Sequence, residues 1–127
     1  MNIGEAAAAS GVNTKMIRHY ESIGLIAPAE RSESGYRLYG QSDLHVLSFI
    51  KRARKLGFSI KDIQRLLGLW QDRRPSADVK KMALAHVAEL NTRIAELQGM
   101  RDTLRNLAKK CNGDARPSCP ILKDLAG

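Results

Sequence analysis

The stretch Ala7-Ala8-Ala9-Ser10-Gly11-Val12-Asn13-Thr14-Lys15-Met16-Ile17 decides the fold of the first part of the chain. A small residue, Ala7, is followed by Gly11 and then by the apolar Ile17. This order is typical of a helix-turn-helix, because the alanine lets two helices approach, the glycine makes the turn and the isoleucine fills the space between the helices. We therefore expect a short helix before Gly11 and a second helix from Thr14 towards Ile23.

The second of these helices is the candidate element for reading DNA. Its expected exposed face carries four residues that suit nucleic acid: Lys15, Arg18, His19 and Tyr20. Lysine and arginine pair with phosphates or with guanine, and a tyrosine hydroxyl can donate to a phosphate. An ordinary helical hairpin with a solvated basic face stays open as the alternative.

A tight turn at Ser34-Gly35 follows, and the residues after it alternate in character as in a short β-hairpin. Arginines and tyrosines flank the turn and suit the phosphate backbone of DNA. They are Arg31, Tyr36, Arg37 and Tyr39. We interpret this segment as the wing of a winged helix-turn-helix, with a simple connector as the alternative.

Two further helices complete the first domain, which we place at residues 1–71. The third should begin after Ser42 and end near Gly57, with a basic cluster in its last turns that includes Arg54. The fourth should begin at Ser59. Its apolar residues recur at helical spacing, and we expect all of them to lie in the core: Ile63, Leu66, Leu67 and Trp70.

A long helix is expected over residues 76–110, with Ser76 as its N-cap after the break at Pro75. Its apolar residues alternate spacings of four and three, as in the heptad repeat of a coiled coil. The seam positions are Ala83, Val87, Leu90, Ile94, Leu97, Arg101, Leu104 and Ala108. Such a seam needs a partner, so we predict a dimer; a helix that folds back on its own domain is the alternative.

Residues 111–127 contain the only two cysteines, Cys111 and Cys119, on either side of a loop with glycine and proline. Pro120 suits the first position of a short helix over residues 120–125, which makes Cys119 its N-cap. Soft thiolates favour Cu(I), for which two ligands suffice, whereas structural zinc takes four. A metal site, a redox switch and coincidence all remain explanations of the cysteine pair.

The composition favours a polyanionic partner. Lysine and arginine number 21 against 13 acidic residues, which gives a net charge of +8 and points to nucleic acid. No apolar run reaches the roughly 20 residues that span a bilayer, and the start lacks the basic region of a signal peptide. We therefore expect a cytoplasmic protein with no membrane partner. No nucleophile with an adjacent base, phosphate-binding glycine loop or carboxylate pair indicates an enzyme.

Several stretches resemble the MerR family of bacterial transcriptional regulators, and in particular its copper-efflux (CueR-type) branch. They are Met16-Ile17-Arg18-His19-Tyr20-Glu21 with Gly24-Leu25, Arg31-Ser32-Glu33-Ser34-Gly35-Tyr36-Arg37, Arg54-Lys55-Leu56-Gly57-Phe58, Ser76-Ala77-Asp78-Val79-Lys80 and the loop from Cys111 to Pro120. The resemblance implies a homodimer on a palindromic promoter, with its long helices paired antiparallel. It also implies that the effector-bound dimer bends and untwists the DNA so that RNA polymerase can use the promoter.

The resemblance also assigns roles to residues. It places Lys15, Arg18 and Tyr20 in the recognition helix, Tyr36 and Arg37 in the wing and Arg54 in the adjoining basic helix. His19 departs from the family, in which an aromatic such as Phe or Tyr is more usual. Ser76 stands where divalent-metal sensors of the family carry a cysteine. This implies one Cu(I) per subunit at Cys111 and Cys119, or Ag(I) or Au(I), with copper-efflux or detoxification genes as the regulated genes.

Two other functions remain open. The cysteines could form the redox switch of a DNA-binding regulator, or the protein could be a cytosolic metal buffer or an architectural DNA protein. The charges around the loop, Lys109, Lys110 and Arg116, are expected to be solvated. His86 is expected to be solvated or to lie at the edge of the core.

Overall fold

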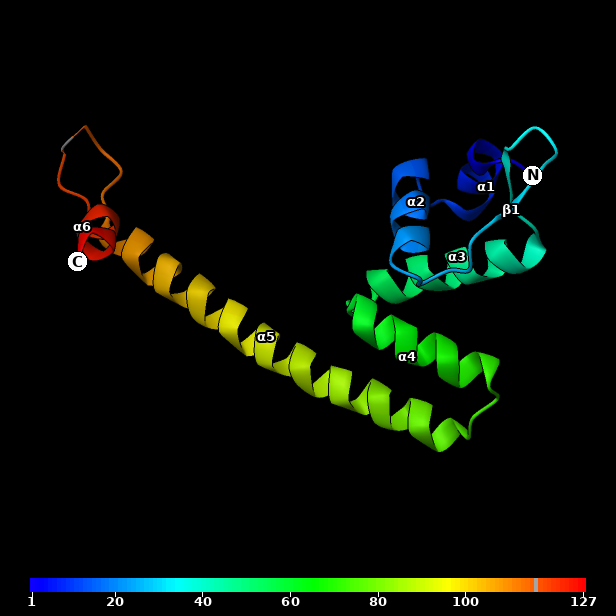
Figure 1. Ribbon diagram of the computed structural model, residues 1–127. Helices are drawn as coiled ribbons and strands as arrows, with labels where there is room; N and C mark the ends of the chain where they lie inside the picture. The colour runs from blue at the N-terminus through cyan, green and yellow to red at the C-terminus, as the bar shows by residue number, and fades with distance from the viewer. Residues whose placement is uncertain (116) are drawn as a thin grey trace. The chain divides into compact units, whose positions relative to one another are not determined.

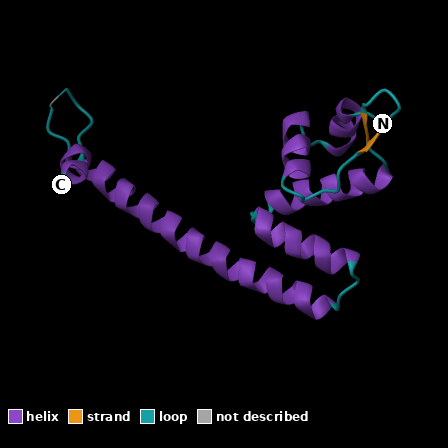
Figure 2. Ribbon diagram, in the orientation of Figure 1, coloured by secondary structure: helices purple, strands orange, loops and turns teal. Residues whose placement is uncertain are grey.

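The computed structural model describes residues 1–127 except Arg116, and it is mainly helical with a small two-stranded sheet (Figures 1 and 2). The elements are α1 Ile3–Ser10, α2 Thr14–Ser22, β1 Glu30–Arg31, β2 Arg37–Leu38, α3 Gln41–Lys55, α4 Ile60–Gln71, α5 Ser76–Lys110 and α6 Pro120–Ala126. The chain divides into two compact units, Met1–Val79 and Lys80–Gly127. The predicted fold class, a winged helix-turn-helix followed by a long helix, is confirmed.

The predicted turn between the first two helices is present. Gly11 ends α1 with φ +76°, and its N–H donates to the carbonyl of Ala7 at 2.9 Å. The side chain of Asn13 then caps α2 by accepting the N–H of Met16 at 2.8 Å. Ile17 is completely buried, as the helix-turn-helix spacing predicts. The backbone conformation at Gly11, the cap at Asn13 and the burial of Ile17 therefore all support the predicted start of α2.

The left-handed backbone at Gly11 supports a stability prediction. Gly11→Ala is expected to lower the free energy of unfolding by about 1–2 kcal/mol, because an L residue is strained at this φ. The new Cβ would also meet the amino group of Lys51. Gly68→Ala is the matched control, because Gly68 lies inside α4 with open space around the Cβ position. It is expected to raise stability by about 0.5–1 kcal/mol. Urea unfolding measures both, and a Gly11→Ala variant as stable as the wild type would contradict the prediction.

One hydrophobic core holds the first unit together. α1 packs against α2 and α3, and α3 packs against α4. The largest completely buried side chains come from α2, α3 and α4, and each contributes about 1.5–3 kcal/mol by its burial. They are Ile17, Leu47, Ile50 and Ile63. Because one face of α2 is used in this core, the opposite face is left for solvent or for a partner.

The apolar stripe of α4 is only partly as predicted. Ile63, Leu66 and Leu67 are buried, but Trp70 is 50% exposed. Its ring stacks on that of Phe49, with centroids 5.1 Å apart and planes inclined by 7°. The expectation that Trp70 lies in the core is wrong for the single chain, because Phe49 covers one face of its ring and half of its surface stays exposed.

The predicted β-hairpin wing is present but short. β1 and β2 pair antiparallel, with Glu30 opposite Leu38 and Arg31 opposite Arg37. The turn between them contains Gly35 at φ +83°. Each strand contributes one arginine to the cross-strand pair Arg31–Arg37, so the hairpin is basic at this position.

The long helix α5 has 35 residues and is about 50 Å long. It begins at Ser76, so Ser76 is its first residue and not the N-cap that the sequence predicted. The N–H of Asp78 already donates to the carbonyl of Pro75 at 3.1 Å, which starts the first turn one residue earlier. In the part of the chain that the structure describes, no helix is long and apolar enough to cross a membrane.

Candidate DNA-binding surface and thiol site

The exposed face of α2 carries three of the four residues predicted for it. Lys15, Arg18 and His19 are exposed, but Tyr20 is only 5% exposed and belongs to the core. Tyr20 follows Ile17 by three residues, and this helical spacing puts both side chains on the same, buried side. The expectation that Tyr20 lies near the exposed face is therefore wrong.

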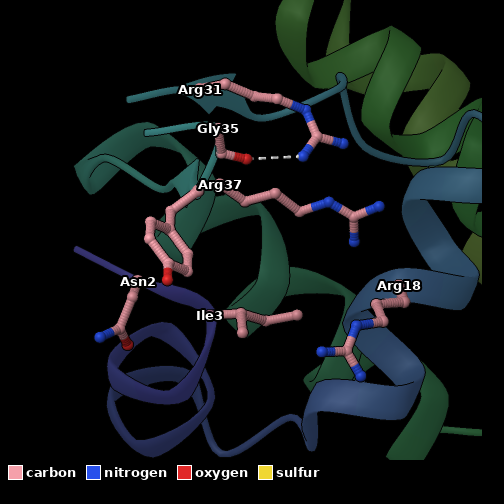
Figure 3. A pocket seen from close by; sticks show the side chains of 7 residues that line it. Asn2, Ile3, Arg18, Arg31, Gly35 and Arg37 are labelled. Carbon is pink, nitrogen blue, oxygen red and sulfur yellow. Dashed lines mark hydrogen bonds between the residues drawn. The ribbon is translucent and has the colours of Figure 1, made fainter. Parts of the chain in front are cut away.

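Three arginines converge on one surface hollow of about 280 Å³ between α2 and the wing (Figure 3). Arg18 comes from α2, Arg31 from β1 and Arg37 from β2. The other lining residues are Asn2, Ile3, Gly35 and Tyr36. Arginine presents a planar fork of donors that matches a phosphate group. The hollow therefore has the charge and the donors to hold DNA, and the exposed Tyr36 also lines it.

A second basic hollow, of about 380 Å³, lies where α3 meets the start of α2. Its cationic side chains are those of Lys51, Arg54 and Lys55, and Asn13 and Tyr20 also line it. Arg54 is held in place because its Nη1 donates to the carbonyl of Phe58 at 3.0 Å. The sequence assigned Arg54 alone of these three to DNA. Lys51 and Lys55 belong to the same basic cluster in the sequence, and this cluster could have indicated that they line the hollow as well.

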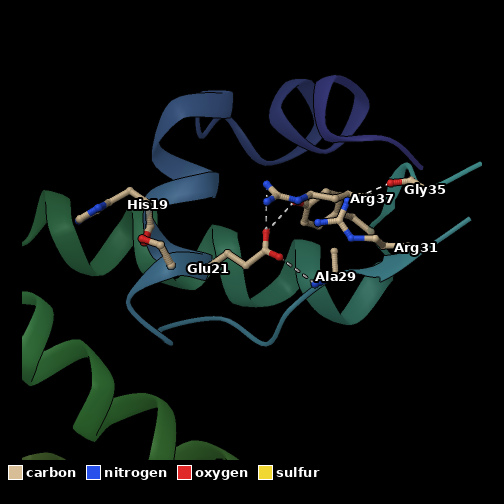
Figure 4. Close-up of polar contacts among 8 residues, drawn as sticks. His19, Glu21, Ala29, Arg31, Gly35 and Arg37 are labelled. Atoms are coloured by element: carbon tan, nitrogen blue, oxygen red, sulfur yellow. Dashed lines mark hydrogen bonds and ion pairs between the residues drawn. The ribbon is translucent and has the colours of Figure 1, made fainter.

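Glu21 joins α2 to the wing, a role that no pattern in the sequence indicates. Its Oε1 accepts the N–H of Ala29 at 3.2 Å (Figure 4). Its Oε2 accepts the hydroxyl of Tyr39 at 3.1 Å. Arg37 Nη1 pairs with the same Oε2 at 3.5 Å. Burial raises the pKa of Tyr39, and the hydrogen bond to Glu21 raises it further, so the phenol remains a proton donor at neutral pH.

The two cysteines lie close together in the second unit. Cys111 Sγ donates a hydrogen bond to Cys119 Sγ over 3.6 Å, and both residues are half-buried. This separation is far longer than a disulfide bond of about 2.05 Å. It is short enough for both sulfurs to bind a single ion. The intervening loop includes Arg116, which lies outside the described residues, so its expected solvation is not addressed.

Cys119 occupies the predicted position at the start of the terminal helix. It is the N-cap of α6, and Pro120 is the first helical residue. The backbone N–H of Leu122 lowers the pKa of the Cys119 thiol, and the hydrogen bond from Cys111 lowers it further. The start of α6 therefore stabilises a thiolate, the form of cysteine that binds metals.

The donor set fits a soft ion that needs few ligands. Among the described residues, no group of three or more His, Cys, Asp or Glu side chains could hold a metal. Two sulfurs from one chain satisfy a two-coordinate monovalent ion but not zinc, which takes four ligands in structural sites. Beside Cys119 is an open hollow of about 660 Å³ to which Lys110 and Lys123 contribute.

The other residues noted around this unit have ordinary roles. Lys109 and Lys110 are exposed, as expected. His86 is buried rather than solvated, and its Nδ1 lies 3.6 Å from a carboxylate oxygen of Glu89. Ser76 belongs to the first unit and the cysteines to the second.

The chain is similar to known regulators along its whole length. The family model described as "MerR HTH family regulatory protein" matches residues 1–69, and that described as "MerR, DNA binding" matches residues 44–107. Heavy metal-dependent transcription regulator 2 of Rhizobium meliloti is 58% identical over 127 residues, which cover 99% of this chain and 86% of that protein. HTH-type transcriptional regulator CueR of Salmonella typhimurium is 47% identical, with 100% and 93% covered.

A solved structure is similar to this chain in both fold and sequence. The crystal structure of the transcription regulator PbrR691 from Ralstonia metallidurans, in complex with lead(II), matches with a TM-score of 0.83 and 33% identity. The match covers 98% of this chain and 98% of that chain. The helix-turn-helix, the long helix and the terminal loop all fall within this range.

Proposed function

Because the chain belongs to the MerR family of transcriptional regulators, we propose that it is a Cu(I)-responsive activator of copper-efflux or detoxification genes. Members of this family are DNA-binding regulators rather than enzymes, and they bind promoter DNA as homodimers. Relatives named as heavy-metal regulators support a metal as the signal. The proposal adds the identity of the ion, its ligands and the consequence of its binding.

The observation that carries the proposal is the pair of sulfurs 3.6 Å apart, with no larger ligand group among the described residues. We assign one Cu(I) per subunit to Cys111 and Cys119, with Ag(I) or Au(I) as ions of the same chemistry. A bis-thiolate with a monovalent ion has one net negative charge. The N–H groups at the start of α6, such as that of Leu122, stabilise this charge.

Ser76 supports the same assignment. A divalent ion would leave a bis-thiolate neutral and would favour a further ligand. By the resemblance to divalent-metal sensors of the family, which carry a cysteine at this place, Ser76 would offer only a hard, neutral hydroxyl instead of a thiolate. We therefore propose that Ser76 contributes to selectivity for monovalent ions.

The proposed DNA contacts combine the exposed face of α2 with the two basic hollows. We propose that Lys15, Arg18 and His19 on α2 approach the base edges, while the wing and α3 hold the backbone. The backbone contacts are Arg31, Tyr36, Arg37 and Arg54. Tyr20 lines the second hollow, but its burial assigns it mainly to the core. Metal binding then changes the shape of the promoter so that RNA polymerase can start transcription.

Transcription in vitro tests the proposal. The run-off product from the promoter next to the gene of this protein should rise with Cu(I) under reductant. It should reach its plateau at one ion per subunit. Ag(I) should act in the same way, while Zn(II) and Pb(II) should not. Equal activation by Pb(II), the ion bound by PbrR691, would contradict the monovalent assignment. A product that no metal increases would favour a metal buffer or an architectural DNA protein.

The distance between the sulfurs also favours a second candidate, a thiol redox switch. Closing the gap from 3.6 Å to a bond of about 2.05 Å needs only a local movement of the loop. Peroxide added to metal-free protein on the same template separates the two mechanisms. Activation by peroxide without copper would support the redox switch, and no response to it would support the metal sensor.

A further inference from the structure

We propose that Glu21 is a positioning residue that fixes the wing against the recognition helix and so sets how well the protein distinguishes its own promoter from other DNA. The inference rests on the proposed DNA contacts of α2 and the wing. It concerns a residue that touches no DNA in that proposal and acts through Arg37.

The position of Glu21 calls for an explanation. It is an acidic residue near the end of α2, next to a surface whose other charged groups are Arg18, Arg31 and Arg37. A carboxylate that faced DNA would repel phosphates. However, the side chain of Glu21 is only 12% exposed, so it is directed into the protein and not towards a partner. Its negative charge is compensated by donors within the protein.

Both carboxylate oxygens are used, and every donor comes from the wing or its flanks. Ala29 precedes β1, Arg37 lies in β2 and Tyr39 follows β2. A single side chain of α2 therefore binds β2 and the residue that precedes β1, and Figure 4 shows the contacts to Arg37 and Ala29. Hydrogen bonds to a charged group are among the stronger ones in proteins, because the acceptor carries a full charge.

This connection fixes where the guanidinium of Arg37 points. Arg37 lines the three-arginine hollow, and its Nη1 lies 3.5 Å from Glu21 Oε2. With the carboxylate present, the donors of Arg37 have one direction relative to Arg18 on α2. Without it, Arg37 remains a cation that attracts any phosphate, but its distance from α2 is no longer set. Specific binding should therefore suffer, while non-specific binding should not.

The test compares two variants that change the net charge equally. Glu21→Gln and Glu33→Gln each remove one negative charge, and Glu33 lies exposed in the wing turn. Dissociation constants are measured on a duplex that the wild-type protein selects from a random pool and on a scrambled duplex, at two salt concentrations. Glu33→Gln should tighten both by a similar, small factor. Glu21→Gln should lower the ratio of specific to non-specific affinity about 10-fold.

A second variant keeps the charge unchanged and serves if Glu21→Gln folds poorly. Tyr39→Phe removes one donor to Glu21, and it should lower the specificity ratio about 3-fold. Hydrogen exchange at the Ala29 amide reports directly on the connection. That amide should exchange faster in both variants, while amides in the core of α3 keep their wild-type rates. A purely structural role would speed exchange in α3 as well.

The outcomes separate this inference from the function on which it rests. Equal specificity ratios in Glu21→Gln and Glu33→Gln, with unchanged exchange at Ala29, would overturn the positioning role. If Arg37→Ala binds the selected duplex as well as the wild type does, the proposed wing contact is wrong, and the inference falls with it. Loss of specificity in Arg37→Ala and in Glu21→Gln, but not in Glu33→Gln, supports both.

Discussion

Replacing Cys111 or Cys119 with serine is expected to lower the affinity for Cu(I) by about 1,000-fold or more. Each substitution removes one of the two sulfurs that lie 3.6 Å apart, and a serine hydroxyl is a hard, neutral donor that does not suit a soft ion. Loss of an outer-shell partner alone costs about 10- to 100-fold, and loss of a ligand in a two-ligand site should cost more. Activation of transcription by copper should disappear with the binding.

The measurement is competition for Cu(I) with a chromophoric chelator under reductant, followed by run-off transcription. Ser118→Ala is the matched control, because Ser118 is exposed beside Cys119 and its removal leaves both sulfurs in place. The control should bind one ion per subunit with wild-type affinity. Wild-type affinity for Cu(I) in the cysteine variants would show that the loop does not bind the metal.

The local parts of the structure could be predicted because the determining residues are neighbours in sequence. The turn at Gly11 needs a left-handed backbone conformation that glycine readily provides, and Ile17 fills the gap that this turn creates. In the same way, Pro120 is suited to the first turn of a helix, which left Cys119 as the N-cap. In each case a rule about adjacent residues was sufficient.

The wrong predictions for Tyr20, Ser76 and Trp70 have different physical causes. Tyr20 lies three residues after a core residue, and helical spacing alone placed it on the buried face; its chemistry had suggested DNA instead. The N-cap predicted at Ser76 was displaced by one residue, which is the usual uncertainty of a helix end. The exposure of Trp70 depends on how much of its ring Phe49 covers, and spacing within α4 says nothing of that neighbour.

Glu21 shows what sequence patterns cannot supply. Its partners stand 8 residues away, at Ala29, and 18 residues away, at Tyr39. No periodicity within α2 reveals that the wing and its flanking residues contact this carboxylate. The same limit applies to the three-arginine hollow, because Arg31 and Arg37 line it together with Arg18 only after the hairpin has folded.

Leu97→Glu is expected to dissociate the dimer. Leu97 is 63% exposed in the single chain, and it lies on the predicted seam of α5 together with exposed Val87, Ile94 and Leu104. Burying a glutamate in the middle of such a seam loses apolar contact and leaves a charge without water. A truncated leucine in a core costs about 2–5 kcal/mol, and the substitution occurs in both subunits. The dimer dissociation constant should therefore rise by about 1,000-fold or more.

Thr92→Glu separates the effect of the seam from the effect of added charge. Thr92 lies on the face of α5 opposite the seam, where it is exposed and its hydroxyl donates to the carbonyl of Ala88 at 3.2 Å. Sedimentation velocity should show dimers for Thr92→Glu and monomers for Leu97→Glu at the same concentration. Binding to the selected duplex should be lost with the dimer, because regulators of this family bind promoter DNA as homodimers. A dimeric Leu97→Glu protein would show that the chains associate through another face of α5.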